Sequence, residues 1–306
     1  MTQDNRTAVT GFILLGFSEI HELQPLLFTM LLFLYILTLM ANTLIVVVIN
    51  GDHTFDTPMY FFLTHLSCLD VCYLSVIIPI MLENLLVQKM GISMVGCAIQ
   101  MFLFLLFGVA ECFLLAAMAF DQYVAICYPL HYGVIMSRIV RKKLVVASYV
   151  CETAVGLVHT IITFSLPFCA LVINHFFCEI QPLLELLCGD TSLSEIQVIA
   201  VAVFAIMVPF LMIIFSYLPT ILKMPSVEGR HKTSTCSSHL LVVILFYGTA
   251  SSTYLQPKSS YSPPIDKLLS LAYSILTPLL NPIIYSLRNK EVKEALTKQW
   301  RKFIFP

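Results

Sequence analysis

Charged residues are scarce in this sequence. Asp, Glu, Lys and Arg make up 11% of the 306 residues, whereas hydrophobic residues make up 58%. Soluble globular domains carry about a quarter charged and about half apolar residues, so the composition excludes an ordinary soluble domain. The net charge of −1 gives no sign of a polyanion-binding protein. The alternation of polar and apolar residues that is typical of a β-barrel is also absent, so we predict an α-helical membrane protein.

Seven apolar stretches are long enough to cross a membrane, because a transmembrane helix needs about 20 mainly apolar residues. They cover roughly residues 25–49, 58–82, 97–126, 144–165, 196–222, 239–256 and 266–287. Lipid cannot hydrogen-bond to the backbone, so each stretch is expected to be a helix. We therefore predict an all-α membrane protein with one domain, a seven-transmembrane helix bundle at residues 25–287. It is flanked by an extracellular tail (1–24) and a cytoplasmic tail (288–306).

The cytoplasmic tail is expected to form a short amphipathic helix on the inner membrane surface. Its apolar face would carry Val292, Leu296, Trp300 and Phe303, with lysines elsewhere.

Lys and Arg are distributed unevenly along the chain. Thirteen of the seventeen follow the third, fifth and seventh stretches, and only Arg6, Lys89, Lys258 and Lys267 lie on the other side. The positive-inside rule therefore predicts an extracellular N-terminus, although the first loop, "NGDHTFDT", has no Lys or Arg. Asn5 begins a glycosylation sequon on the predicted outer side. The opening residues lack the features of a cleavable signal peptide, so we expect the first helix to be an uncleaved anchor.

Four of the ten cysteines lie in predicted outer segments, where disulfides can form: Cys97, Cys169, Cys178 and Cys188. Four cysteines allow three pairings, and their spacing does not choose among them. No cysteine has the paired spacing or the neighbouring histidines of a zinc site, so we predict no transition-metal site.

Six motifs, in this order, resemble those of the odorant (olfactory) receptors, a branch of the rhodopsin-like G-protein-coupled receptors. They are "PMYFFLTHLSCLD" (58–70), "MAFDQYVAICYPLHY" (118–132), "FSY" (215–217), "KTSTCSSHL" (232–240), "FYG" (246–248) and "PLLNPIIYSLRN" (278–289). The outer-loop segments "LPFC" and "HFFCEIQPLLELLC" are similar to those of the tetrapod-type subdivision.

The resemblance implies a receptor in the plasma membrane and not an enzyme. It implies that small volatile organic molecules bind within the helix bundle and that the receptor activates a stimulatory, olfactory-type G protein, which raises cyclic AMP. The expected partners are thus an odorant, a heterotrimeric G protein and membrane lipid, with no nucleic acid. The same resemblance implies the disulfides Cys97–Cys178 and Cys169–Cys188.

The predicted ligand pocket begins on the third helix. One face of its outer half carries Phe104, Leu105, Gly108, Val109 and Cys112, at helical spacing. The family's pocket positions add Val201, Ala202, Ala205, Tyr247, Ala250, Ser251, Tyr254 and Ser274. Helix packing is the alternative for any single one of these residues, but the set implies a small, mainly apolar cavity with a few hydroxyls.

Two further residues bear on the ligand. Phe104 stands where an amine receptor would need an acid, which argues against an amine ligand. Lys258, at the outer end of the sixth helix, either anchors a carboxylate or aldehyde oxygen or extends into water.

Two acids, Asp70 and Glu111, are expected at similar depth in the bundle. Two buried acids together are costly unless a cation, a proton or amides share their charge. The resemblance adds Asn42 and Asn281 and implies a sodium-ion site, with structural hydrogen bonding as the alternative. No other cofactor is expected. Glu152, in the fourth helix, is either functional or a hydrogen-bonded acid with no signalling role.

The third helix of the family ends in Asp-Arg-Tyr, and this chain has Asp121, Gln122 and Tyr123 there. A glutamine cannot make the charged, bidentate contact of an arginine. Gln122 is therefore either a tolerated variant or a cause of weak signalling. The resemblance places Tyr217 and Tyr285 near the same G-protein-facing end.

Two other functions remain open from the sequence. A transporter or channel could use Asp70, Glu111 and Glu152 as an ion or proton path, but an odd number of helices and no inverted repeat disfavour it. A receptor of the same fold could also recognise a metabolite outside olfaction.

Overall fold

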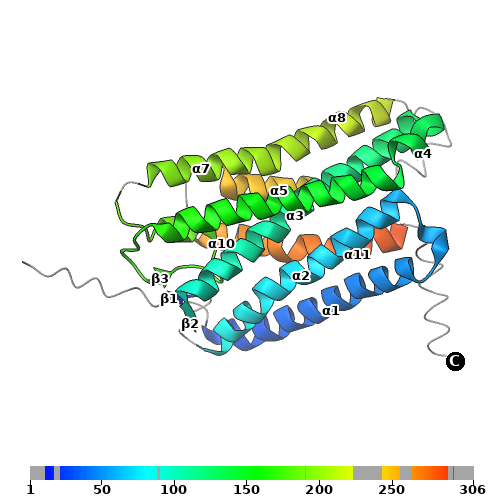
Figure 1. Ribbon diagram of the computed structural model, residues 1–306. Helices are drawn as coiled ribbons and strands as arrows, with labels where there is room; N and C mark the ends of the chain where they lie inside the picture. Colours follow the sequence, from blue (N-terminus) through cyan, green and yellow to red (C-terminus); the bar gives the residue numbers. More distant parts are fainter. Residues whose placement is uncertain are drawn as a thin grey trace, which may run out of the picture.

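Long helices run side by side in the computed structural model (Figure 1). The structure describes residues 11–16, 21–87, 90–189, 191–222, 243–255, 263–288 and 292. In the first half of the chain, the long helices are α1 (Gln24–Asn50), α2 (Pro58–Leu86), α3 (Met94–Cys127) and α5 (Arg138–Ser165). The fifth span joins α7 (Ser192–Ala202), η4 (Val203–Met207) and α8 (Val208–Leu222), and residues 243–254 form the next helix. The last span joins α10 (Pro263–Leu271), η6 (Ala272–Leu276) and α11 (Thr277–Arg288).

Short elements connect these helices. They are η1 (His21–Leu23), η2 (His53–Phe55), η3 (Pro129–His131), α4 (Tyr132–Ile135) and α6 (Ile180–Leu184). Three short strands complete the fold: β1 (Gly11–Leu14), β2 (Met90–Ser93) and β3 (Val172–Ile173).

The predicted fold class, an all-α membrane bundle, is confirmed. Within the described residues, six helical segments are long and apolar enough to cross a membrane, and residues 243–254 lie inside the expected sixth span. Large hydrophobic side chains such as Phe33, Met40, Ile161 and Phe215 are exposed on the outside of the bundle, as lipid contact requires.

The fourth span begins earlier than expected, at Arg138 instead of residue 144. Arg and Lys form helices readily, so the basic segment continues the helix beyond the apolar stretch.

α3 is the central helix of the bundle, because it contacts α2, α5 and α8. The buried residues of α5 follow one another at intervals of three or four and so form a single stripe, which includes Ser148, Glu152, Gly156 and His159. This stripe faces α3, with which α5 shares most of its contacts. Polar residues thus lie on the inner face of α5.

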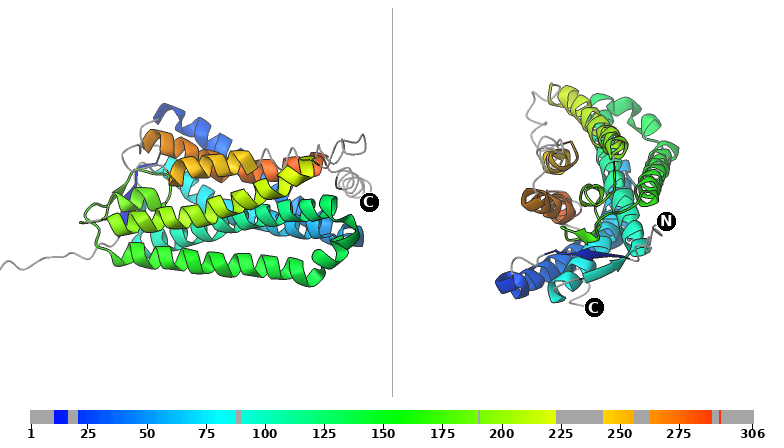
Figure 2. Two further views of the ribbon diagram at one scale, coloured as in Figure 1. Left: turned by 90° about the horizontal axis from the view of Figure 1, so that it is seen from above. Right: turned by 90° about the vertical axis from the view of Figure 1, so that its left-hand side faces the viewer.

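The three strands form a small sheet in the order β2-β1-β3, which the sequence analysis did not predict. β1 pairs antiparallel with β2 and parallel with β3. Figure 2 shows the strands lying across one end of the bundle (right-hand panel). The sheet joins the N-terminal segment to two connections between helices, and Phe12 and Leu14 are buried in it. Gly16 follows with φ of 50°, and a side chain there would collide with the amide of Asn84.

Two disulfides attach the α5–α7 connection to the bundle. Cys97 in the first turn of α3 is bonded to Cys178, and Cys169 is bonded to Cys188. These are the pairs that the family resemblance implied. Gln100 also accepts a hydrogen bond from the backbone N–H of Cys178 at 2.9 Å. The connection is therefore held against the end of α3 that carries the strands.

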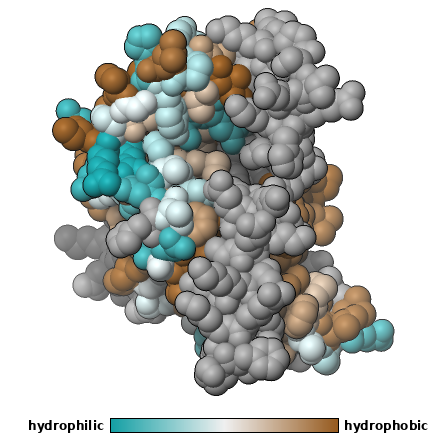
Figure 3. All heavy atoms as spheres, turned by 90° about the vertical axis from the view of Figure 1, so that its right-hand side faces the viewer, coloured by the Kyte–Doolittle hydropathy of each residue, from teal (hydrophilic) through white to brown (hydrophobic). Residues whose placement is uncertain are grey.

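Figure 3 looks onto the opposite end of the bundle, which carries α4. Hydrophilic side chains gather on one side of its described surface, and hydrophobic ones lie near the margins.

Candidate functional site

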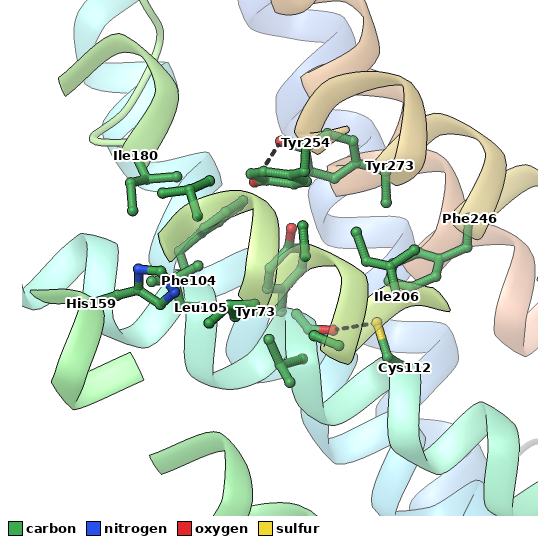
Figure 4. A pocket seen from close by; sticks show the side chains of 17 residues that line it. Tyr73, Phe104, Leu105, Cys112, His159, Ile180, Ile206, Phe246, Tyr254 and Tyr273 are labelled. Carbon is green, nitrogen blue, oxygen red and sulfur yellow. Dashed lines mark hydrogen bonds between the residues drawn. The ribbon is translucent and has the colours of Figure 1, made fainter. Parts of the chain in front are cut away.

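An apolar cavity lies between the helices, near the end of the bundle that carries the strands (Figure 4). The centre of a water-sized sphere can occupy about 80 Å³ of it. Its lining comes from α2, α3, α5, α6, α7, η4, the helix at residues 243–254, and η6. The lining residues are Tyr73, Phe104, Leu105, Gly108, Val109, Cys112, His159, Ile180, Val198, Val201, Ala202, Ala205, Ile206, Phe246, Ala250, Tyr254 and Tyr273.

The lining includes ten of the thirteen residues expected from the sequence. All five residues of the third helix are among them. They lie on one face of α3 because their spacing matches the helical repeat. Phe104 packs its ring 5.5 Å from that of Tyr73 and 5.1 Å from that of Phe177. Gly108 leaves space, because an added Cβ would come no closer than 3.8 Å to Tyr73.

Two π-helical turns shape the cavity. Ala205 and Ile206 lie in η4, and Tyr273 lies in η6. A π-turn inserts an extra residue into a helix, shifts the faces of the following residues and is frequent at functional sites. Both turns lie within membrane spans and present side chains to the cavity.

Three expected pocket residues do not line this cavity. The Tyr247 hydroxyl donates to the Cys112 carbonyl at 2.7 Å, so this side chain ties two helices together. Ser251 lies one residue after Ala250, and one residue turns a helix by about 100°, away from the cavity. Ser274 is likewise one residue beyond Tyr273 and lies next to the Tyr73 hydroxyl.

Glu179 binds two residues of the cavity lining, Tyr254 and Tyr273. It precedes α6 and is fully buried. Its carboxylate accepts hydrogen bonds from Tyr254 at 2.6 Å, from Ser270 at 2.9 Å and from Tyr273. The Nε2 atom of His175 lies 3.3 Å from it. Burial lowers the pKa of His175, although Glu179 opposes this shift, so the neutral imidazole is favoured.

Seven lining residues were missed by the sequence analysis: Tyr73, His159, Ile180, Val198, Ile206, Phe246 and Tyr273. Helical periodicity could have found some of them, because Val198 and Phe246 lie three or four residues before expected positions. His159 lies seven residues after Glu152 and shares its helix face. Ile180 could not be found in this way, because a loop brings it to the cavity.

The structure brings Asp70, Glu111 and Asn281 together in the middle of the bundle. The side-chain N–H groups of Asn281 donate to Asp70 at 3.0 and 3.3 Å and to Glu111 at 3.3 Å. Asn42 is tied instead to the backbone, through the carbonyls of Thr38 and Pro278. The side-chain oxygens of Asn42 and Asn281 are buried without a hydrogen-bond donor among the described residues.

Asp121 and Gln122 have different partners at the α4 end of the bundle. Tyr132 donates to Asp121 at 2.8 Å, and Tyr217 donates to the Gln122 side-chain oxygen at 2.8 Å. Burial, followed by the charge of Asp121, raises the pKa of Tyr132, so its hydroxyl remains protonated and able to donate. The Tyr123 hydroxyl lies 3.5 Å from that of Tyr128.

An ion pair at this end was not anticipated. Asp56, before α2, binds Arg141 at 2.6 Å and also binds Arg138. The hydrogen bond from Arg141, together with the charges of both arginines, holds the pKa of Asp56 below its usual value. Arg141 is buried, lies 5.1 Å over the ring of Phe61 and interacts electrostatically with Asp121.

Glu152 is fully buried between α5 and α3, and neither of its carboxyl oxygens has a hydrogen-bond partner among the described residues. It is not part of the cavity lining.

Several predictions fall outside the described residues. These are the glycosylation of Asn5, the role of Lys258, the side chain of Tyr285 and most of the C-terminal amphipathic helix. Of that helix, only Val292 is described, and it is helical and buried.

A helical membrane bundle with an apolar cavity between its helices and a polar cluster among its central helices is the arrangement expected of a membrane receptor of the G-protein-coupled class. The family model described as "Olfactory receptor" matches residues 31–302. Human olfactory receptor 10C1 is 52% identical over 305 residues, which cover 98% of each chain. Human olfactory receptor 10A3 is 53% identical over 307 residues, which cover 99% of this chain and 98% of that receptor. The chain therefore belongs to the olfactory receptor family, whose members are signalling receptors and not enzymes.

Proposed function

We propose that this receptor binds small volatile organic molecules in the cavity between α3 and the neighbouring helices. The almost wholly apolar lining is the observation that carries this proposal. Such a cavity stabilises the binding of small molecules by burying their apolar surface, and it offers few polar groups to orient them. An amine ligand would need an acidic side chain at the position of Phe104 on α3. The phenyl ring there supports a neutral ligand.

Binding activates a stimulatory, olfactory-type G protein and so raises cyclic AMP. The ligand shifts a pre-existing equilibrium by binding the active arrangement more tightly. The end that carries Asp121, Gln122 and Tyr217 faces the G protein in the cytoplasm, and the strand end faces outward. The excess of Lys and Arg on the cytoplasmic segments supports this orientation in the plasma membrane.

Asp70, Glu111 and Asn281 share a proton or a sodium ion. Two carboxyl groups meet one amide there, and the side-chain oxygens of Asn42 and Asn281 have no donor within the described part of the chain, which fits an oxygen-liganded cation or an added proton. A bound sodium ion would supply positive charge between the two carboxylates. Asp70 and Glu111 would hold it, and Asn281 would orient them.

The test of the cavity is to fill it at Gly108. Gly108→Phe should abolish responses to larger odorants or raise their half-maximal concentration by about tenfold or more, because the ring occupies the cavity. Gly108→Ala adds only one methyl group and should have a smaller effect. Cyclic AMP would be measured against a chemically diverse odorant panel, at equal surface expression.

Val158→Phe is the matched control, since Val158 is half exposed on the outside of α5. It should leave the panel unchanged. If Gly108→Phe leaves the response to every agonist as it was, odorants bind elsewhere.

A further inference from the structure

Most polar side chains in the cavity lining already have hydrogen-bond partners. The hydroxyls of Tyr254 and Tyr273 donate to Glu179, and each has only one proton to donate. The thiol of Cys112 donates to the carbonyl of Gly108 at 3.4 Å. The Tyr73 hydroxyl lies next to Ser274, whose Oγ atom has no hydrogen-bond partner among the described residues. The hydroxyls of Tyr254 and Tyr273 are therefore not available as donors to a ligand.

His159 differs from these residues. Its side chain is 3% exposed and lines the cavity, yet it has no hydrogen-bond partner among the described residues. Figure 4 shows the ring pointing from α5 toward the other lining side chains. A buried polar group without a partner requires an explanation, and one explanation is a ligand that supplies the partner.

We propose that His159 is the residue that anchors the polar group of the odorant, by donating its N–H to a carbonyl oxygen. This inference rests on the proposed function. A neutral imidazole has one N–H donor and one acceptor nitrogen. A ketone or aldehyde has an acceptor and no donor, so it pairs with the N–H of His159 and not with the acceptor oxygens of Tyr254 and Tyr273. The apolar remainder of the molecule then lies against α3 and η4.

The stability of the ligand-free receptor tests whether the imidazole lacks a partner. In purified receptor reconstituted in lipid nanodiscs, His159→Leu should leave the thermal midpoint unchanged or raise it, because no hydrogen bond is lost. A clear fall in the midpoint would mean that His159 makes a structural hydrogen bond, for example through water, and would overturn the inference.

Matched pairs of probes test the contact with the ligand. Acetophenone and α-methylstyrene have nearly the same shape, as do cyclohexanone and methylenecyclohexane, and only the first of each pair has a carbonyl oxygen. Dissociation constants for the four compounds would be measured on the purified receptor. The natural receptor should bind each ketone more tightly than its alkene. His159→Leu should weaken ketone binding roughly two- to tenfold, the effect of one neutral hydrogen bond, and leave the alkenes unchanged.

His159→Gln keeps an N–H donor on a side chain of similar reach and should retain part of the preference for ketones. If His159→Leu leaves the preference unchanged while Gly108→Phe removes binding of all four compounds, the cavity is the ligand site but His159 is not the anchor. If Gly108→Phe also has no effect, the proposed site itself is wrong. Absence of binding of all four compounds to the natural receptor would overturn the assignment of a carbonyl ligand.

Discussion

Gln122 stands where the family resemblance implies an arginine, and its side-chain oxygen accepts a hydrogen bond from Tyr217. Asp121 does not depend on residue 122 for a partner, because Tyr132 donates to it and the charge of Arg141 acts on it. Asp121 and Gln122 therefore have separate partners here. Other residues hold Asp121, and Gln122 keeps a neutral link to α8.

Replacing Gln122 by arginine should strengthen signalling. A neutral hydrogen bond contributes about 0.5 to 1.5 kcal/mol and one to a charged group about 1.5 to 3 kcal/mol. Gln122→Arg should therefore raise the maximal cyclic AMP response at equal surface expression, without changing which odorants are recognised. Asp121→Asn should activate more strongly in the Gln122→Arg background, since there it also breaks the pair with the new arginine. An unchanged maximal and basal response would identify Gln122 as a tolerated variant.

At the scale of helices, Asn281 connects three elements. It lies on α11 and donates to Asp70 on α2 and to Glu111 on α3. Residues that share a partner do not act independently. A movement of α11 relative to α2 and α3 must therefore change the environment of both acids.

The substitutions Asp70→Asn and Glu111→Gln should have non-additive effects. Each substitution removes one of two acids that share a proton or a cation. Either substitution should therefore change thermal stability or basal activity less when the other is already present than when it is made in the natural receptor. The interaction in the double-mutant cycle should be about 0.5 to 3 kcal/mol, and it should vary with sodium concentration or pH. Strictly additive effects that are insensitive to both conditions would contradict a shared ion or proton.

The disulfide between Cys97 and Cys178 links α3 to the connection that carries Glu179 and α6. Cys97→Ser should lower the thermal midpoint and surface expression, since loss of a native disulfide typically costs about 2 to 5 kcal/mol in small domains. It should also weaken odorant binding, because Ile180, two residues after Cys178, lines the cavity and Glu179 binds the lining residue Tyr254. Cys72→Ser, at a free and exposed cysteine, is the control. Equal expression and binding of the two variants would show that the disulfide is dispensable.

At the scale of the whole molecule, the distribution of Lys and Arg predicts an extracellular N-terminus. Asn5 should then be glycosylated, and treatment with a glycosidase should increase the electrophoretic mobility of the natural receptor but not that of Asn5→Gln. An N-terminal epitope should be accessible to antibody on intact cells. An epitope that is detected only after the cells are permeabilised would reverse the predicted orientation.

The sequence predicted the membrane helices and much of the cavity for one physical reason: both depend on local pattern. Long apolar stretches must form helices in lipid, and residues such as Phe104, Gly108 and Cys112 share a face through the helical repeat alone. The strands escaped prediction because segments as short as Val172–Ile173 have no distinctive pattern and are stabilised only by pairing.

Hydrogen bonding in the cavity was decided by the tertiary structure. Tyr254 was expected in the pocket, where a few hydroxyls would face the ligand, yet the disulfide-linked connection places Glu179, 75 residues away in the chain, next to its hydroxyl. The packing of α5 against α3 places His159 in the cavity lining, with no hydrogen-bond partner in the described ranges of the chain. Sequence by itself determined which residues are apolar, which are polar and which helix face each occupies. Only the tertiary structure decided which polar groups meet, because a hydrogen bond requires contact within about 3 Å between atoms that lie far apart along the chain.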